Sequence, residues 1–144
     1  MSTFAAATGI VGSSVTLLGV MAGPSMIKSG NGVVVNLASG SATMDPPAPP
    51  GEGGWGLSYA ASKASFGRIA GAINSEYRDA GIKAFNLSPG FVITESGKAR
   101  GGADAIVEAG FAATPASVPA AAAVWLATDL DADRYLGRVV DGPK

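Results

Sequence analysis

Three side chains in this sequence have the chemistry of an acid–base site. Tyr59 and Lys63 stand four residues apart in GLSYAASKASFG, so on a helix they would share one face. A free phenol ionises only at a pH of about 10, but a neighbouring cation and a helix N-terminus both favour the phenolate. Tyr59 could then serve as a general acid and base, while a hydroxyl such as that of Ser39 polarises a carbonyl or alcohol oxygen.

The elements around the Tyr–Lys pair are predicted to form a strand–helix–strand unit. Val33–Ala38 (VVVNLA) is a short β-branched run without alternation, which is typical of a strand buried on both faces. From Leu57 the apolar and small residues recur with a helical period over about 22 residues, and Asp79–Gly81 closes this helix. Ile82–Leu87 is the second predicted strand, and Ser88–Gly90 stops it. A helical crossover of this kind implies that the two strands are parallel.

Taken alone, a Tyr and a Lys at helical spacing form a weak pattern, which two ordinary side chains of a helix also produce. Ligands of parallel α/β sheets bind beyond the carboxyl ends of the strands. Ser39 directly follows the first strand, Tyr59 lies in the first turn of the helix, and Ser88–Thr94 follows the second strand. We therefore expect these segments to meet at one edge of the sheet, which favours the catalytic interpretation.

The rest of the chain adds elements but no internal repeat, linker or second domain. Residues 1–144 are therefore predicted to form a single α/β domain. Five further segments are predicted: a helix from near Ala5 to Lys28 with a break at Gly23–Pro24, a Pro- and Gly-rich loop from Ser39 to Trp55 that is neither helix nor sheet interior, a short helix from Ala103 to Phe111, a helix from Pro115 or Ala116 to Thr128, and a final strand at Arg138–Gly142.

The composition argues against several kinds of partner and of chemistry. The net charge is −1 and the basic residues are scattered, so we expect neither nucleic acid nor a membrane surface as a partner. The chain has no Cys and no His, which removes disulfides, thiolate nucleophiles, imidazole bases and nearly every zinc site, and we expect no metal site. Any reaction must use Tyr, Lys, Ser, Thr, Asn or carboxylate side chains.

No charged residue precedes Lys28, so the first segment could be a signal peptide or a membrane span. A signal peptide would need a positively charged start, and Gly, Ser and Thr residues interrupt the apolar run that a span requires. We expect instead a helix that is buried on most of its faces, either in a core or at a subunit interface.

Several segments together resemble the short-chain dehydrogenase/reductase family. VVVNLAS (Val33–Ser39) resembles the family's strand that ends in its catalytic Ser, and YAASK (Tyr59–Lys63) resembles its Tyr-x-x-x-Lys motif. NLSPGFVIT (Asn86–Thr94) resembles its Asn-x-x-x-Pro-Gly segment. VWLATD (Val124–Asp129) and GRVVDG (Gly137–Gly142) resemble the family's last helix and closing strand. These motifs follow one another in the family's order and cover most of the chain.

The resemblance implies an NAD(P)-dependent oxidoreductase with a Rossmann-like, doubly wound parallel sheet, in which hydride moves between nicotinamide and a carbonyl or alcohol substrate. Tyr59 would pass the proton, Lys63 would activate Tyr59 and hold the nicotinamide ribose, and Ser39 would hold the substrate oxygen. The resemblance further implies a cytoplasmic homo-oligomer, either a dimer or a tetramer. The residues implied at the cofactor, NAD or NADP, are Tyr59, Lys63, Pro89, Gly90, Val92 and Thr94.

Three departures from the family pattern limit this resemblance. The glycine-rich cofactor turn is missing, since the spacing within Thr8–Gly12 is too short, so the sequence is predicted to be the carboxyl-terminal portion with the substrate and nicotinamide half. The position of the family's proton-relay Asn falls near Val11. The loop between Ser39 and Tyr59 is longer than usual and either shapes a substrate site or is a tolerated surface loop. Ser41 is the alternative to Ser39 as the hydroxyl in position.

Two functions are open at this point. The chain is either part of an active dehydrogenase or a truncated, non-catalytic relative that acts as an interaction or structural module. Backbone amides at a helix N-terminus hold the pyrophosphate in such enzymes, so we expect NAD(P)H binding by this chain alone to be weak or undetectable. An upstream reading frame that encodes a strand, a glycine-rich turn and a helix would favour the first function.

Overall fold

One parallel sheet forms the centre of the computed structural model, which describes residues 23–95, 107–108, 110 and 112–143. Its strands are β1 (Gly32–Leu37), β2 (Ile82–Ser88) and β3 (Val139–Asp141), in the order β1-β2-β3. β2 pairs with β1 along the whole length of β1. With β3 it pairs only through the last three residues of β2, Asn86–Ser88. The predicted parallel pairing is confirmed, and the first two strands lie within one residue of their expected ends.

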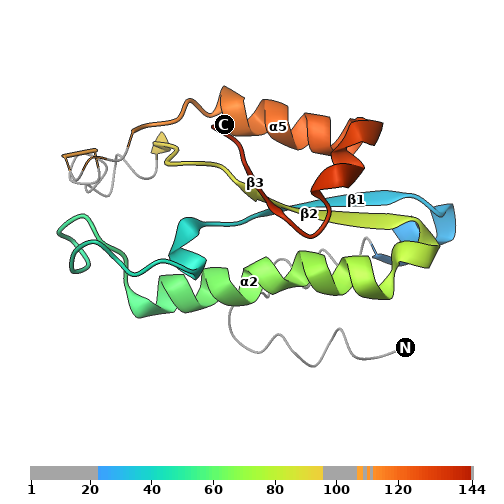
Figure 1. Cartoon of the computed structure of the whole chain (residues 1–144), viewed down its shortest axis with the longest axis horizontal. Helices are drawn as coiled ribbons and strands as arrows, with labels where there is room; N and C mark the ends of the chain where they lie inside the picture. Colours follow the sequence, from blue (N-terminus) through green and yellow to red (C-terminus); the bar gives the residue numbers. More distant parts are fainter. Residues whose placement is uncertain (1–22, 96–106, 109, 111, 144) are drawn as a thin grey trace.

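Two α-helices cover opposite faces of the sheet (Figure 1). α2 (Leu57–Glu76) is the predicted crossover helix, and the chain continues from it into the 3-10 helix η2 (Arg78–Ala80). Gly81 then reverses the chain with a φ of 72°, a conformation that glycine adopts at low cost. α5 (Ser117–Thr128) is also predicted by the sequence and begins one or two residues later than expected.

Side chains alternate between the two faces along each strand, so each helix packs on its own core cluster. The buried cluster on the α2 face consists of Ala70, Ile73, Ile82 and Ala84. The buried cluster on the α5 face consists of Phe85, Leu87, Leu126 and Ala132. The consecutive residues Ala84 and Phe85 of β2 therefore belong to different clusters, which explains why a strand covered on both faces is apolar without alternation.

Two short 3-10 helices were not predicted from the sequence. η1 (Gly40–Ala42) opens the long loop between β1 and α2, so the prediction of no helix in this loop is wrong for these residues. η3 (Leu130–Tyr135) follows α5, and at its start the Asp129 carboxylate accepts a hydrogen bond from Asp131 N at 2.9 Å. In both cases a short polar side chain binds a backbone amide of the turn and so favours it.

The first described residues, 23–29, are helical, and Gly30 follows with a φ of 66°. The break predicted at Gly23–Pro24 lies at the first described residue, so it stays a prediction. The earlier part of that predicted helix, Val11 within it and most of the predicted Ala103–Phe111 helix lie outside the described residues. Within the part of the chain that the structure describes, no helix is long and apolar enough to cross a membrane.

Two asparagines from neighbouring strands hold the middle of α2 on the sheet. Asn36 and Asn86 are register partners in β1 and β2. Asn36 Nδ2 donates to the Phe66 carbonyl and to Asn86 Oδ1, each at 2.8 Å, and Asn86 Nδ2 donates to the Gly67 carbonyl at 2.8 Å. The pair therefore joins β1, β2 and two adjacent backbone carbonyls of α2 by directional bonds.

A third asparagine, Asn74, ties the end of α2 to β2. Its Oδ1 accepts from Ala84 N at 2.7 Å, and its Nδ2 donates to the Ala84 carbonyl at 2.8 Å. Backbone groups alternate between the two sides of a strand, and Leu87 turns its carbonyl toward β1. Ala84 therefore turns its N–H and C=O to the opposite side, at a level that β3 does not reach.

Candidate active site

The carboxyl ends of β1 and β2 bring the predicted site segments to one end of the sheet. Ala38 N donates to the Leu87 carbonyl at 2.8 Å, so Ser39 leaves β1 at the level where Ser88 and Pro89 leave β2. The N-terminus of α2 lies at the same end, together with both loops (Figure 1). This is the edge at which parallel α/β sheets bind ligands.

Tyr59 and Lys63 lie close together on α2. The Lys63 ammonium is 5.9 Å from the centre of the Tyr59 ring and 5.6 Å from the centre of the Phe66 ring. It donates a hydrogen bond to the Leu37 carbonyl at 2.9 Å, which ties α2 to the last residue of β1. Tyr59 is 47% exposed, and within the described residues its hydroxyl makes no hydrogen bond. The phenol is thus open to an incoming ligand.

Ser39 lies two residues after the end of β1 and caps the start of η1. Its Oγ accepts hydrogen bonds from Ser41 N at 3.3 Å and from Ser41 Oγ at 2.9 Å. Ser39 is partly exposed, whereas Ser41 is buried with only 5% of its surface accessible. Of the two hydroxyls that the sequence offered, Ser39 is therefore the more accessible one and Ser41 lies behind it.

The segment after β2 is held by the chain that precedes α5. Phe91 forms a parallel bridge with Ala113, and Thr114 N donates to the Phe91 carbonyl at 2.8 Å. Gly90 has a φ of 73°, and a Cβ at this position would lie 2.5 Å from Thr114 Oγ1, so both conformation and space require glycine. This segment, which leaves the carboxyl end of β2, contains all four further residues predicted at the cofactor: Pro89, Gly90, Val92 and Thr94.

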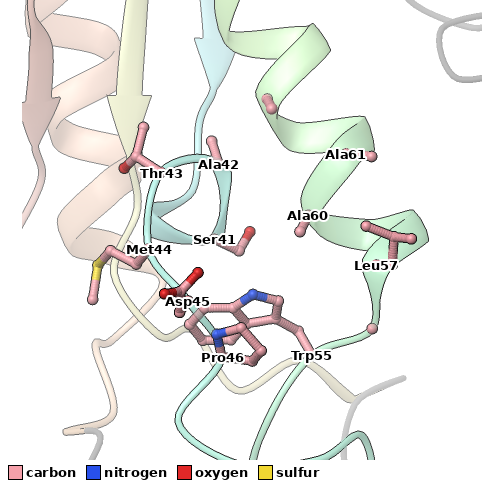
Figure 2. Close-up of a pocket in the computed structure, with 12 residues that line it drawn as sticks. Ser41, Ala42, Thr43, Met44, Asp45, Pro46, Trp55, Leu57, Ala60 and Ala61 are labelled. Atoms are coloured by element: carbon pink, nitrogen blue, oxygen red, sulfur yellow. The ribbon is translucent and has the colours of Figure 1, made fainter.

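A pocket of about 440 Å³ opens between η1, the loop that follows it and one flank of α2 (Figure 2). From α2 it is lined by residues that include Ala60 and Ala64 but not Tyr59, because successive helical residues turn by about 100° around the axis. Trp55 also lines this pocket, and its Nε1 is buried without a hydrogen-bond partner among the described residues. The pocket therefore adjoins Ser41 and lies on a different flank of α2 from the phenol.

The polar groups at the sheet edge can bind and polarise ligand oxygens. Ser39 and Tyr59 each carry one hydroxyl proton, and Lys63 carries three ammonium hydrogens, of which the Leu37 carbonyl takes one. In residues 23–95, 107–108, 110 and 112–143, no group of three or more His, Cys, Asp or Glu side chains could hold a metal ion. The described edge thus offers hydrogen-bond donors from the end of β1 and from α2.

Two contacts of the site were not predicted from the sequence. A hydroxyl residue two positions after Ser39 has the spacing of a local Ser/Thr turn, so the Ser41 contact had a visible signal. The contact between Lys63 and the Leu37 carbonyl had none, because every residue has a backbone carbonyl and nothing in Leu37 marks it.

The sequence also matches a known family. The family model described as short chain dehydrogenase matches residues 7–104, which is more than half of the chain. The chain therefore belongs to the short-chain dehydrogenase family. No curated protein matches it.

Solved dehydrogenase structures have a similar fold. A gluconate 5-dehydrogenase from Burkholderia cenocepacia, solved with NADP and tartrate, matches with a TM-score of 0.69 and 21% identity, covering 86% of this chain and 48% of its own. A protein named as an NAD(P)-dependent gluconate 5-dehydrogenase from Beutenbergia cavernae, with bound NADP, matches with a TM-score of 0.66 and 29% identity, covering 88% and 50%. A 7α-hydroxysteroid dehydrogenase, solved with NADH and 7-oxo glycochenodeoxycholic acid, matches with a TM-score of 0.70 and 20% identity, covering 89% and 50%. The Rossmann-like fold class is thus confirmed, and the chain spans about half the length of these solved chains.

Proposed function

We propose that this chain takes part in NAD(P)-dependent hydride transfer between nicotinamide and a carbonyl or alcohol substrate, with Tyr59 as the general acid and base. The observation that carries the proposal is the position of Ser39, Tyr59 and Lys63 at one carboxyl edge of the sheet. The family match supports it. NADP and NADH in the similar solved structures support the choice of cofactor.

In the direction of reduction, a proton and a hydride reach the carbonyl group from different sources. The hydride would come from the nicotinamide of a bound NAD(P)H, which would supply it to the carbonyl carbon. The Tyr59 hydroxyl gives its proton to the carbonyl oxygen, and Ser39 donates a hydrogen bond to the same oxygen. The Lys63 ammonium beside the Tyr59 ring attracts the negative charge that the proton leaves behind.

The free donors at this edge fit the sugar end of a nicotinamide nucleotide. Two Lys63 ammonium hydrogens remain beyond the one bonded to Leu37, and sugar hydroxyls accept such bonds. The segment that holds Pro89, Gly90, Val92 and Thr94 would contact the nicotinamide end. The same proposal makes residues 1–144 the substrate and nicotinamide half, from the carboxyl-terminal portion of the family, in a cytoplasmic homo-oligomer.

A second candidate function is that of a non-catalytic interaction or structural module. One observation favours it. The Lys63 ammonium is engaged by the Leu37 carbonyl within the protein, so one of its hydrogens is not available to a cofactor. The two candidates differ in whether a carbonyl compound makes the chain oxidise a reduced nicotinamide.

Oxidation of NADH and NADPH by the purified chain, followed by absorbance with a panel of ketones and aldehydes, separates the two candidates. We expect carbonyl-dependent oxidation that falls by about 10²–10⁴-fold in Tyr59→Phe, because the variant lacks the proton donor. Tyr77→Phe is the matched control, since Tyr77 lies at the other end of the helix against the core, and it should keep the full rate. Full activity in Tyr59→Phe would refute the acid–base role. Lack of carbonyl-dependent oxidation by the wild-type chain would favour the second candidate.

A further inference from the structure

The η1 turn brings together two serine hydroxyls just after the end of β1. Ser41 directs both of its donors, the backbone N–H and the Oγ–H, at the single Ser39 Oγ, at 3.3 and 2.9 Å. Ser41 is 5% exposed, so its hydroxyl does not compete for ligands in solvent. Its hydrogen bond to Ser39 is instead sheltered from water, which strengthens it.

These two bonds determine what the Ser39 hydroxyl can do. A serine hydroxyl has one proton to donate and two lone pairs that accept. Both lone pairs of Ser39 Oγ are occupied by Ser41, and within the described residues Ser39 Oγ donates to no acceptor. What remains for a ligand is the Ser39 proton alone.

The backbone around the two hydroxyls is fixed by its own bonds. Ala42 N donates to the Ser39 carbonyl at 3.1 Å, and Thr43 N and Met44 N both donate to the Gly40 carbonyl at 3.0 Å. Ser39 itself has extended backbone angles, with φ −154° and ψ 145°, so the turn does not strain it. The Ser39 Oγ therefore has a defined position relative to the end of β1.

We propose that Ser41 is a positioning residue for the reaction: by donating both of its hydrogens to Ser39 Oγ, it makes Ser39 a pure hydrogen-bond donor toward the substrate oxygen. This inference rests on the proposed function for its catalytic meaning. It excludes Ser39 as an acceptor of the substrate proton, which leaves that step to Tyr59. It also assigns a role to Ser41 other than that of replacing Ser39.

The hydrogen bonds themselves can be tested without any enzymatic activity, because the chain contains no cysteine. Ser39→Cys introduces a single thiol at the receiving position. Hydrogen bonds to a thiolate favour ionisation. We expect half-ionisation of this thiol below its ordinary pH of about 8.5, measured as the pH dependence of its alkylation by iodoacetamide. Adding Ser41→Ala should raise that midpoint by about one pH unit.

Three further variants make this test specific. Ser41→Thr in the Ser39→Cys background keeps a hydroxyl and should restore the low midpoint. Thr43→Ala is the matched control, since Thr43 lies in the same turn and donates to Gly40, not to Ser39, and it should leave the midpoint unchanged. Ser41→Gly removes the same hydroxyl and replaces Ser41→Ala if circular dichroism shows that the latter is unfolded. An equal midpoint with and without the Ser41 hydroxyl in folded protein would overturn the proposal.

A kinetic measurement distinguishes failure of this inference from failure of the proposed function. If the chain reduces carbonyl compounds, Ser41→Ala should lower kcat about tenfold with little change in the KM for NAD(P)H, and Ser41→Thr should restore it. Unchanged kcat in folded Ser41→Ala would overturn the positioning role. The chain could fail to reduce carbonyl compounds while the ionisation midpoint of the thiol in Ser39→Cys still depends on the Ser41 hydroxyl. In that case the hydrogen-bond geometry stands and only the proposed function is refuted.

Discussion

The two faces of the sheet hold their helices by different means. On the α5 face, Phe85 and Leu87 of β2 pack against Leu126 and are almost completely buried. On the α2 face, only the small or medium-sized side chains of Ala70 and Ile73 are buried from the helix, although α2 is the longer of the two. The α2 face compensates with amide hydrogen bonds to the strands.

This difference between the two faces indicates how the molecule positions its reactive groups. Apolar packing is nondirectional, so it stabilises a helix without defining its register sharply, whereas hydrogen bonds weaken steeply when length or angle changes. The helix held by directional bonds is the one that carries Tyr59 and Lys63. The strands that supply or receive those bonds lead directly into Ser39 and Pro89.

The largest loss in free energy of unfolding is expected from a substitution in the apolar cluster on the α5 face. Phe85→Ala should lower the free energy of unfolding by about 3–5 kcal/mol, because it removes a buried ring and leaves a cavity. Urea denaturation followed by circular dichroism measures this loss. Leu130→Ala is the control on the same face, since Leu130 is 85% exposed, and it should change the stability by less than about 0.5 kcal/mol. Similar values for both variants would contradict the assignment of the core.

A smaller loss is expected from the polar face. Asn86→Leu should cost about 2–3 kcal/mol, since it removes a donor to Gly67 and the acceptor of a buried Asn36 hydrogen. The same denaturation experiment measures it, with the exposed Asn31→Ala as control.

A double variant sharpens this second prediction. Asn36→Leu combined with Asn86→Leu leaves no unpaired amide between the strands, so its cost should be smaller than the sum of the single costs by about 1 kcal/mol. Strict additivity would mean that the two asparagines do not act as a pair. If Asn36→Leu/Asn86→Leu stays folded, its rate of carbonyl reduction should also fall. Converted to free energy, this fall should exceed the loss in free energy of unfolding, because α2 keeps its apolar contacts but loses its register.

The smallest effect is expected for a surface ion pair on the α5 face. Lys83 Nζ lies 2.6 Å from Asp133 Oδ1, and the two side chains are 37% and 48% exposed. Asp133→Asn should therefore change the free energy of unfolding by no more than about 1 kcal/mol, and by less at high salt. Asp131→Asn, in the same 3-10 helix, is the control. A loss comparable to that of Asn86→Leu would show that the ion pair, and not the apolar core, holds η3 to the sheet.

The sequence predicted those elements whose cause is local. The β-branched run of Val33–Val35 marked β1, and helical periodicity followed by Gly81 marked α2 and its end. The order of strand, helix and strand then predicted the parallel pairing and the edge at which Ser39, Tyr59 and Pro89 lie. The strands' positions therefore followed from pattern and chain connectivity alone.

Contacts between distant residues were not predictable in the same way. Asn36 and Asn86 interrupt two apolar strands at matching positions, which was a visible signal, but 50 residues separate them and only the register shows that they pair. The partners of Asn74 and Lys63 are backbone groups, which every residue has. η1 and η3 depend on single side-chain hydrogen bonds that begin a turn, and such bonds are weaker than the periodic signals of long elements.

The amide of Asn74 has a consequence for how this chain behaves among other chains. By binding both the N–H and the C=O of Ala84, it occupies the groups with which a foreign strand would begin to pair. Uncovered strand edges are templates for aggregation, and β3 leaves this part of β2 uncovered. One side chain of α2 therefore satisfies the backbone groups of β2 at the point where β3 ends.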